Sequence, residues 1–182
     1  GLNVFSDNIE FQTAVRSSMA HHRHLMNELE KMLIARDIKD RRGSQLSKSL
    51  HLIAEQVHKR SLIVIFSDMM DDEEQTDALF SSLQHLKHNK HEVILFHVTD
   101  KAHEYDLEYA SRPHRFIDME SGAEIRLTPS EIRDQYVSHL QAFHKSLKMK
   151  CATYKIDFIE ADINKGFEQI LLPYLLKRQK LY

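Results

Sequence analysis

Four aspartates follow two apolar segments of this chain in a pattern that could bind a ligand. Asp68 comes directly after the apolar residues 62–66, Asp71 and Asp72 follow it, and Asp100 ends the second segment. An uninterrupted apolar run rich in β-branched residues predicts a buried parallel strand. Carboxylates at the carboxyl ends of such strands lie where open α/β sheets bind their ligands. Asp68 is therefore the first candidate for a functional residue.

Two other interpretations of these aspartates stay open. Residues 67–72 could simply cap the helix predicted from Glu73, because Asp and Ser oxygens satisfy free N–H groups at a helix start. Alternatively, the four aspartates could bind Mg²⁺ for phosphoryl chemistry, as in a metal-dependent hydrolase or phosphatase. The chain contains no glycine-rich phosphate loop, no Gly-x-Ser-x-Gly motif and no His-Glu-x-x-His motif, so sequence motifs do not favour an enzyme.

The histidines do not form a recognisable metal site. His21 and His24 are one helical turn apart, but no adjacent carboxylate or third ligand accompanies them. His85, His88 and His91 surround a predicted helix end and strand start. There a cation complements the helix dipole, so we expect all of these histidines to face solvent.

Composition limits the classes of partner and compartment. The 182 residues carry a net charge of −2, with 42% hydrophobic and 29% charged residues. This favours a single globular domain over residues 1–182 and gives no indication of a nucleic-acid partner. We find no apolar run long enough for a membrane span. The single cysteine, Cys151, excludes an internal disulfide and fits a reducing compartment; its helical position predicts a buried, unreactive thiol.

The order of apolar patterns predicts an α/β domain. Residues 62–66 should form a strand covered on both faces, followed by a helix over 73–87 and a strand over 91–100. Two antiparallel strands are expected at 1–5 and 9–15. The helix over 19–35 should bury one stripe, which comprises Leu25, Met26, Leu29, Met32 and Leu33.

The second half of the chain adds a hairpin to this unit. Residues 115–119 and 123–127 predict two short strands joined at Ser121-Gly122. A long helix over 130–153, a sheet-edge strand over 156–161 and a final helix over 167–180 complete the pattern.

Several of these segments together resemble a known family. The chain resembles the C-terminal two-thirds of a von Willebrand factor A-type domain, and it is more closely similar to the bacterial domain-of-unknown-function 58 family, which is associated with MoxR-type AAA+ ATPases. The segments that carry the resemblance are GLNVFSD at 1–7, GSQL at 43–46, SLIVIFSDMMDD at 61–72, VILFHVTD at 93–100, FIDMESG at 116–122, RDQY at 133–136 and YLLKR at 174–178. The similarity extends over essentially the whole chain.

The resemblance implies a fold and a metal site. The fold is a three-layer α/β/α, Rossmann-like, mostly parallel sheet with one antiparallel edge strand, here with the inserted hairpin. The site is a metal-ion-dependent adhesion site, in which Mg²⁺ binds carboxylate and hydroxyl oxygens and an open position accepts a partner's carboxylate. Asp68 matches the family's strand-end aspartate, and Ser44 lies where a threonine is expected. Asp71, Asp72 and Asp100 would line the binding rim.

One element of that site has no match. No Asp-x-Ser-x-Ser motif occurs between Gly1 and Tyr182, so we expect its strand to lie upstream or to be missing, and we expect little or no metal binding by this chain alone. Its loss would let the neighbouring strands close up, or would leave exposed edges that favour self-association.

The resemblance therefore implies a non-enzymatic protein-interaction module. Its partner would be a protein, plausibly a MoxR-type AAA+ ATPase, and its compartment the bacterial cytoplasm. Two alternatives stay open at this point: the Mg²⁺-dependent hydrolase described above, and a structural module whose metal site has decayed.

Overall fold

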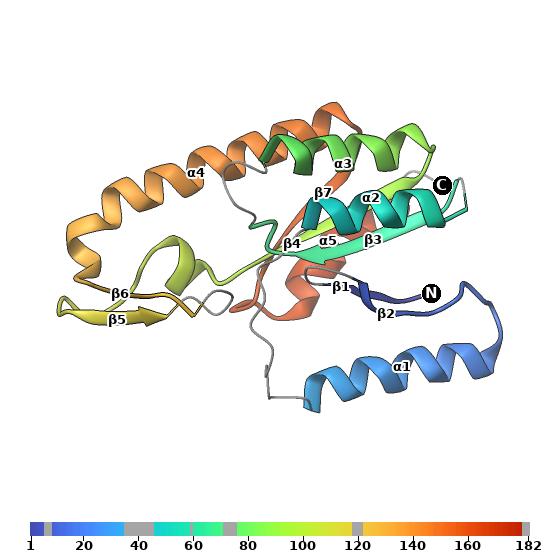
Figure 1. Cartoon of the computed structure of the whole chain (residues 1–182), viewed down its shortest axis with the longest axis horizontal. Coiled ribbons are helices and arrows are strands. Elements are labelled where there is room, and N and C mark those ends of the chain that lie inside the picture. Colours follow the sequence, from blue (N-terminus) through green and yellow to red (C-terminus); the bar gives the residue numbers. More distant parts are fainter. Residues whose placement is uncertain (6–8, 35–45, 59, 71–75, 118–121, 180–182) are drawn as a thin grey trace.

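Figure 1 shows the computed structural model of this chain. The structure describes residues 1–5, 9–34, 46–58, 60–70, 76–117 and 122–179. Three of the predicted site residues, Ser44, Asp71 and Asp72, lie outside these ranges, as does the predicted turn residue Ser121.

A parallel sheet of three strands forms the centre of the fold. Its order is β3 (Leu62–Ser67), β4 (Glu92–Thr99) and β7 (Asp157–Asp162), with β4 in the middle. Helix α3 (Thr76–His88) lies between β3 and β4 in the chain, as expected for a strand–helix–strand unit. The predicted α/β class is confirmed, and β7 is an edge strand of this sheet as predicted.

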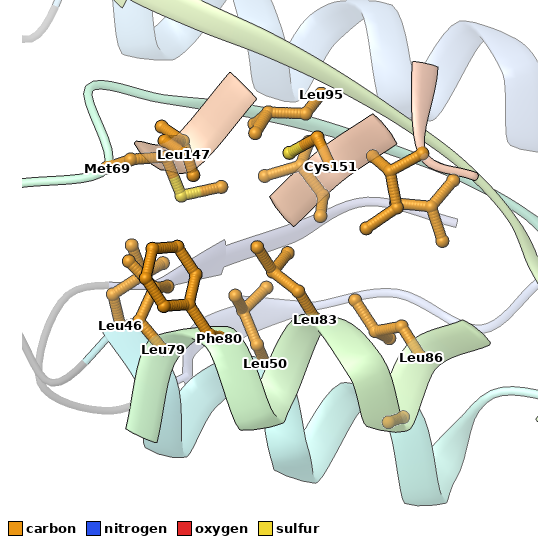
Figure 2. Close-up of a cluster of buried hydrophobic side chains, with 14 residues drawn as sticks. Leu46, Leu50, Met69, Leu79, Phe80, Leu83, Leu86, Leu95, Leu147 and Cys151 are labelled. Carbon is orange, nitrogen blue, oxygen red and sulfur yellow. The ribbon is translucent and has the colours of Figure 1, made fainter. Parts of the chain in front are cut away.

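Three helices cover one face of the sheet and form the main hydrophobic core. They are α2 (Leu46–Gln56), α3 and α4 (Pro129–Thr153). Figure 2 shows side chains of α2 and α3 pointing toward α4 and β4. The completely buried members of this core are Met69, Leu79, Leu83, Leu86, Leu95, Leu147 and Cys151. Burial of this continuous apolar surface is what holds α2 and α3 against the strands.

The opposite face is covered only in part. Helix α5 (Phe167–Gln179) packs on Ile94, Phe96 and Ala161 of β4 and β7. The expectation that β3 is covered on both faces is wrong, because Leu62, Val64 and Phe66 are 50%, 45% and 65% exposed. The strand alternates because only its other face, which includes the buried Ile65, meets helices α2 and α3.

The antiparallel strands form two separate pairs. Strands β1 (Asn3–Phe5) and β2 (Ile9–Gln12) pair near the N-terminus, and β5 (His114–Ile117) pairs with β6 (Glu124–Leu127). Both pairings confirm predicted antiparallel strands. Neither pair is hydrogen-bonded to the parallel sheet within the described residues, so the predicted antiparallel edge strand is not seen there. Strands β1 and β3 have therefore not closed up on each other.

Helix α1 (Met19–Ile34) differs most from its prediction. It forms at the expected position, and the Ser18 side chain caps it by accepting a hydrogen bond from the His21 N–H, at 3.2 Å. The predicted buried stripe is wrong, because no residue of α1 is buried and the exposed fraction of Leu33 is 83%. Figure 1 shows α1 (blue) away from the parallel sheet, so no element of the described core covers its apolar face.

Candidate functional site

Asp68 lies on a tight turn at the carboxyl end of β3. The Ser67 hydroxyl accepts a hydrogen bond from the Met69 N–H at 3.0 Å, and the Asp68 Oδ1 accepts one from the Met70 N–H at 3.1 Å. Met69 has a φ of 55°, in the left-handed region that only strong local or tertiary contacts stabilise in a residue with a side chain. Its side chain is completely buried in the main core. The Asp68 residue itself is exposed.

A buried histidine from the next strand also contacts this turn. The His97 ring of β4 is 1% exposed, and its Nε2 lies 2.8 Å from the Asp68 carbonyl oxygen. The ring stacks on His144 of α4, with centroids 5.3 Å apart and planes at 27°, and it lies 5.5 Å from the Phe158 ring of β7. Burial lowers the pKa of His97, because the charged imidazolium would lose its hydration.

The carboxylate of Asp100 is occupied by local hydrogen bonds. It accepts the His103 backbone N–H at 3.2 Å, the His103 Nδ1–H at 2.8 Å and the Asn164 amide at 2.8 Å. These bonds, chiefly the one from Asn164, hold the pKa of Asp100 below its ordinary value. Asp100 thus caps the short π-helix Lys101–Tyr105. The capping interpretation of residues 67–72 concerns a helix start that lies outside the described ranges.

Asn164 joins two strand ends at this edge of the sheet. Besides its bond to Asp100, its side-chain amide donates to Asp162 Oδ1 at 3.1 Å, and its backbone N–H donates to the same oxygen at 3.1 Å. These bonds hold the pKa of Asp162 low. Asp162 ends β7 just as Asp100 follows β4, so the same edge carries acids from all three strands. Within the described part of the chain, the Asp68 carboxylate bonds to the Met70 N–H of its own turn, whereas Asn164 joins the carboxylates of Asp100 and Asp162.

The described residues do not form a complete metal site. Within them, no group of three or more His, Cys, Asp or Glu side chains is arranged to hold an ion. The exposed carboxylate of Asp68 is of the kind that Mg²⁺ prefers, but a single carboxylate is too few ligands. The further candidates Ser44, Asp71 and Asp72 are outside the described ranges. The described residues therefore offer the type of ligand that Mg²⁺ prefers, but too few of them to form a site.

Two residues away from the edge also bear on the sequence analysis. His91 was expected to face solvent, and this is wrong: it is 1% exposed, and its Nδ1 accepts the Ser61 N–H at 3.2 Å. Burial lowers the pKa of His91. The prediction for Cys151 is confirmed, because the thiol is buried and burial raises its pKa to about 12, so at neutral pH the reactive thiolate is absent.

A family model matches most of this chain. The model for "Protein of unknown function DUF58" matches residues 1–146, which include β3, β4, Asp68 and Asp100. The chain belongs to the DUF58 family. No curated protein matches it, and no solved structure does. The family assignment thus confirms the closer of the two resemblances and carries no assigned activity with it.

The edge of this DUF58 chain also includes residues that motif reasoning did not find. His97 interrupts an otherwise apolar strand, which is the one signal in the sequence that marked it. Asn164 and Asp162 follow the last strand, but nothing in their local sequence indicates a bond to Asp100, 64 positions away. Within the described residues, no helix combines the length and the apolar character that a membrane crossing requires.

Proposed function

We propose that this DUF58 chain is a non-enzymatic protein-interaction module of the von Willebrand factor A-like type, with its binding surface at the carboxyl edge of β3, β4 and β7. The observation that carries the proposal is the contrast between two strand-end acids. Asp68 is exposed on a turn that is fixed by hydrogen bonds and by a buried neighbour, whereas Asp100 is occupied by His103 and Asn164. A preorganised, available carboxylate is what a binding surface needs.

The resemblance supplies the role of this carboxylate. Asp68 and the hydroxyl of Ser44 are this chain's contribution to a Mg²⁺ site, and the ion's open position accepts an acidic side chain of a protein partner. The family's association with MoxR-type AAA+ ATPases makes such an ATPase the first partner to test. The resemblance implies that the remaining ligands would belong to an Asp-x-Ser-x-Ser loop, a motif that does not occur in these 182 residues.

A titration tests the metal part of the proposal. Calorimetry with Mg²⁺ and Mn²⁺ is carried out on this chain and on the same chain extended upstream through an Asp-x-Ser-x-Ser strand, the element that the resemblance implies. We expect binding by the extended form only, and its loss in Asp68→Ala. Asp100→Ala is the matched control, because it removes a strand-end carboxylate that is already occupied by hydrogen bonds.

Two outcomes would overturn this assignment. Metal binding that survives Asp68→Ala would place the ion elsewhere. Phosphatase activity of the extended form that is lost in Asp68→Asn would support the Mg²⁺-dependent hydrolase instead. If neither form binds metal, the module acts as a scaffold without an ion at this edge.

A further inference from the structure

The turn that carries Asp68 is shaped by hydrogen bonds from its own side chains. The Ser67 and Asp68 side chains bond to amides only two residues ahead, so these bonds fix the form of the turn and not its position. Position comes from contacts that are distant in sequence. Among the described residues these are the buried Met69 side chain and the bond between the Asp68 carbonyl and His97, 29 positions away.

The chemistry of this bond fixes the protonation of the ring. A carbonyl oxygen only accepts hydrogen bonds, so the Nε2 of His97 carries the hydrogen and donates it. The Nδ1 is then the unprotonated nitrogen, and it is buried without a hydrogen-bond partner in the described part of the chain. An apolar ring would fill the same space without an unpaired nitrogen. The Nε2–H donor is what His97 provides and such a ring would not.

The surrounding side chains fix the direction of this donor. In the register of the sheet, His97 lies opposite Ser67 of β3 and Glu160 of β7. His144 and Phe158 pack against its ring, so the imidazole has little freedom to turn away from the Asp68 carbonyl. Donor, ring and acceptor thus form a rigid connection from the middle strand of the sheet to the turn.

We propose that His97 is a positioning residue for Asp68, and that its Nε2–H hydrogen bond to the Asp68 carbonyl holds the turn where the carboxylate can meet a cation or a cationic group of a partner. The position of the turn follows from this chain alone. The consequence for metal affinity rests on the function proposed above, so the two need separate measurements.

The first measurement is amide hydrogen exchange by NMR in this chain, without metal. His97→Phe keeps a flat ring and removes the donor, whereas His97→Gln retains an amide N–H that can occupy the position of Nε2. We expect exchange at Met69 and Met70 to be about three to ten times faster in His97→Phe, as expected for the loss of one net hydrogen bond. Exchange in His97→Gln should remain near that of the unchanged protein.

His91→Phe is the matched control for this experiment. His91 directly precedes the same strand, β4, and is equally buried, but its Nδ1 accepts the Ser61 N–H beside the opposite end of β3. It should lower stability without selectively changing exchange at Met69 and Met70. The proposal is wrong if His97→Phe leaves these amides unchanged relative to core amides, or if His97→Gln behaves like His97→Phe.

The second measurement is Mn²⁺ affinity in the extended form. We expect His97→Phe to weaken binding and His97→Gln to restore most of it. If Asp68→Ala abolishes binding while His97→Phe has no effect, the metal site stands and the positioning role for that site fails. If no form binds Mn²⁺ but exchange changes as expected, His97 still positions the turn and the proposed metal site is wrong.

Discussion

The two faces of the parallel sheet differ in how completely they are covered. On one face, α2, α3 and α4 meet residues of β3 and β4 in a core that includes Ile65 and Leu95. On the other, α5 packs on β4 and β7, and Val64 and Phe66 of β3 remain exposed. The same strand therefore contributes to stability on one side and presents an apolar surface on the other. An uninterrupted apolar run can therefore form a strand that is covered on one face and exposed on the other, as β3 is.

The largest difference between the faces should appear in the cost of removing side chains. Leu83→Ala creates a cavity in the completely buried core and should lower the free energy of unfolding by about 2 to 5 kcal/mol. Val64→Ala removes methyl groups that are already near water and should cost less than about 1 kcal/mol. Urea denaturation of both variants measures the difference. If both variants lose the same free energy of unfolding, the face of β3 that carries Val64 must be covered in solution.

The second prediction concerns self-association through the exposed strand β3. Strand β3 pairs only with β4 among the described strands, so no described strand occupies its other edge, and an unpaired strand edge is where a second copy can pair. We expect sedimentation to show reversible association that increases with protein concentration. In an antiparallel pairing centred on Val64, Val64→Lys would bring two ammonium groups together and should weaken association about two- to fivefold.

A control and a contradicting result accompany this experiment. Ile125→Lys places the same charge on another exposed apolar residue, which lies in β6 outside the parallel sheet, and should leave association unchanged. A clean monomer at high concentration would show that the edge of β3 does not pair between copies.

Local patterns were enough to predict the elements, and the reasons are visible in particular residues. The apolar run of β3, the helix after it and the run of β4 predicted a parallel strand–helix–strand unit, because buried parallel strands and amphipathic helices have distinct periods. The hairpin of β5 and β6 was marked by Gly122, which has a φ of 73°. Only a residue without a side chain adopts that conformation freely.

What covers an apolar face could not be predicted in the same way. The stripe on α1 and the outer face of β3 are both apolar, but periodicity does not reveal whether another element packs on them. In the candidate site, too, local sequence predicted some features and tertiary structure decided others. Asp68 was found because it ends a strand, whereas the engagement of Asp100 depends on Asn164, which the fold brings from 64 positions away. The burial of the His91 side chain likewise depends on tertiary packing.

The smallest expected effect is the pH dependence of the unfolding free energy that His91, on the covered face of the sheet, should cause. His91 lies there beside His85 and Lys87, and burial, the largest cause, lowers its pKa below 6.5. The unfolded chain, with the ordinary pKa, then binds a proton more readily than the folded one, so the unfolding free energy should be fully present above about pH 6.5 and fall as the pH drops below it. His91→Gln should reduce this dependence in urea titrations at several pH values. His22→Gln, at an exposed position of α1, should not, and an unchanged slope in His91→Gln would mean that the buried ring is not the group that titrates.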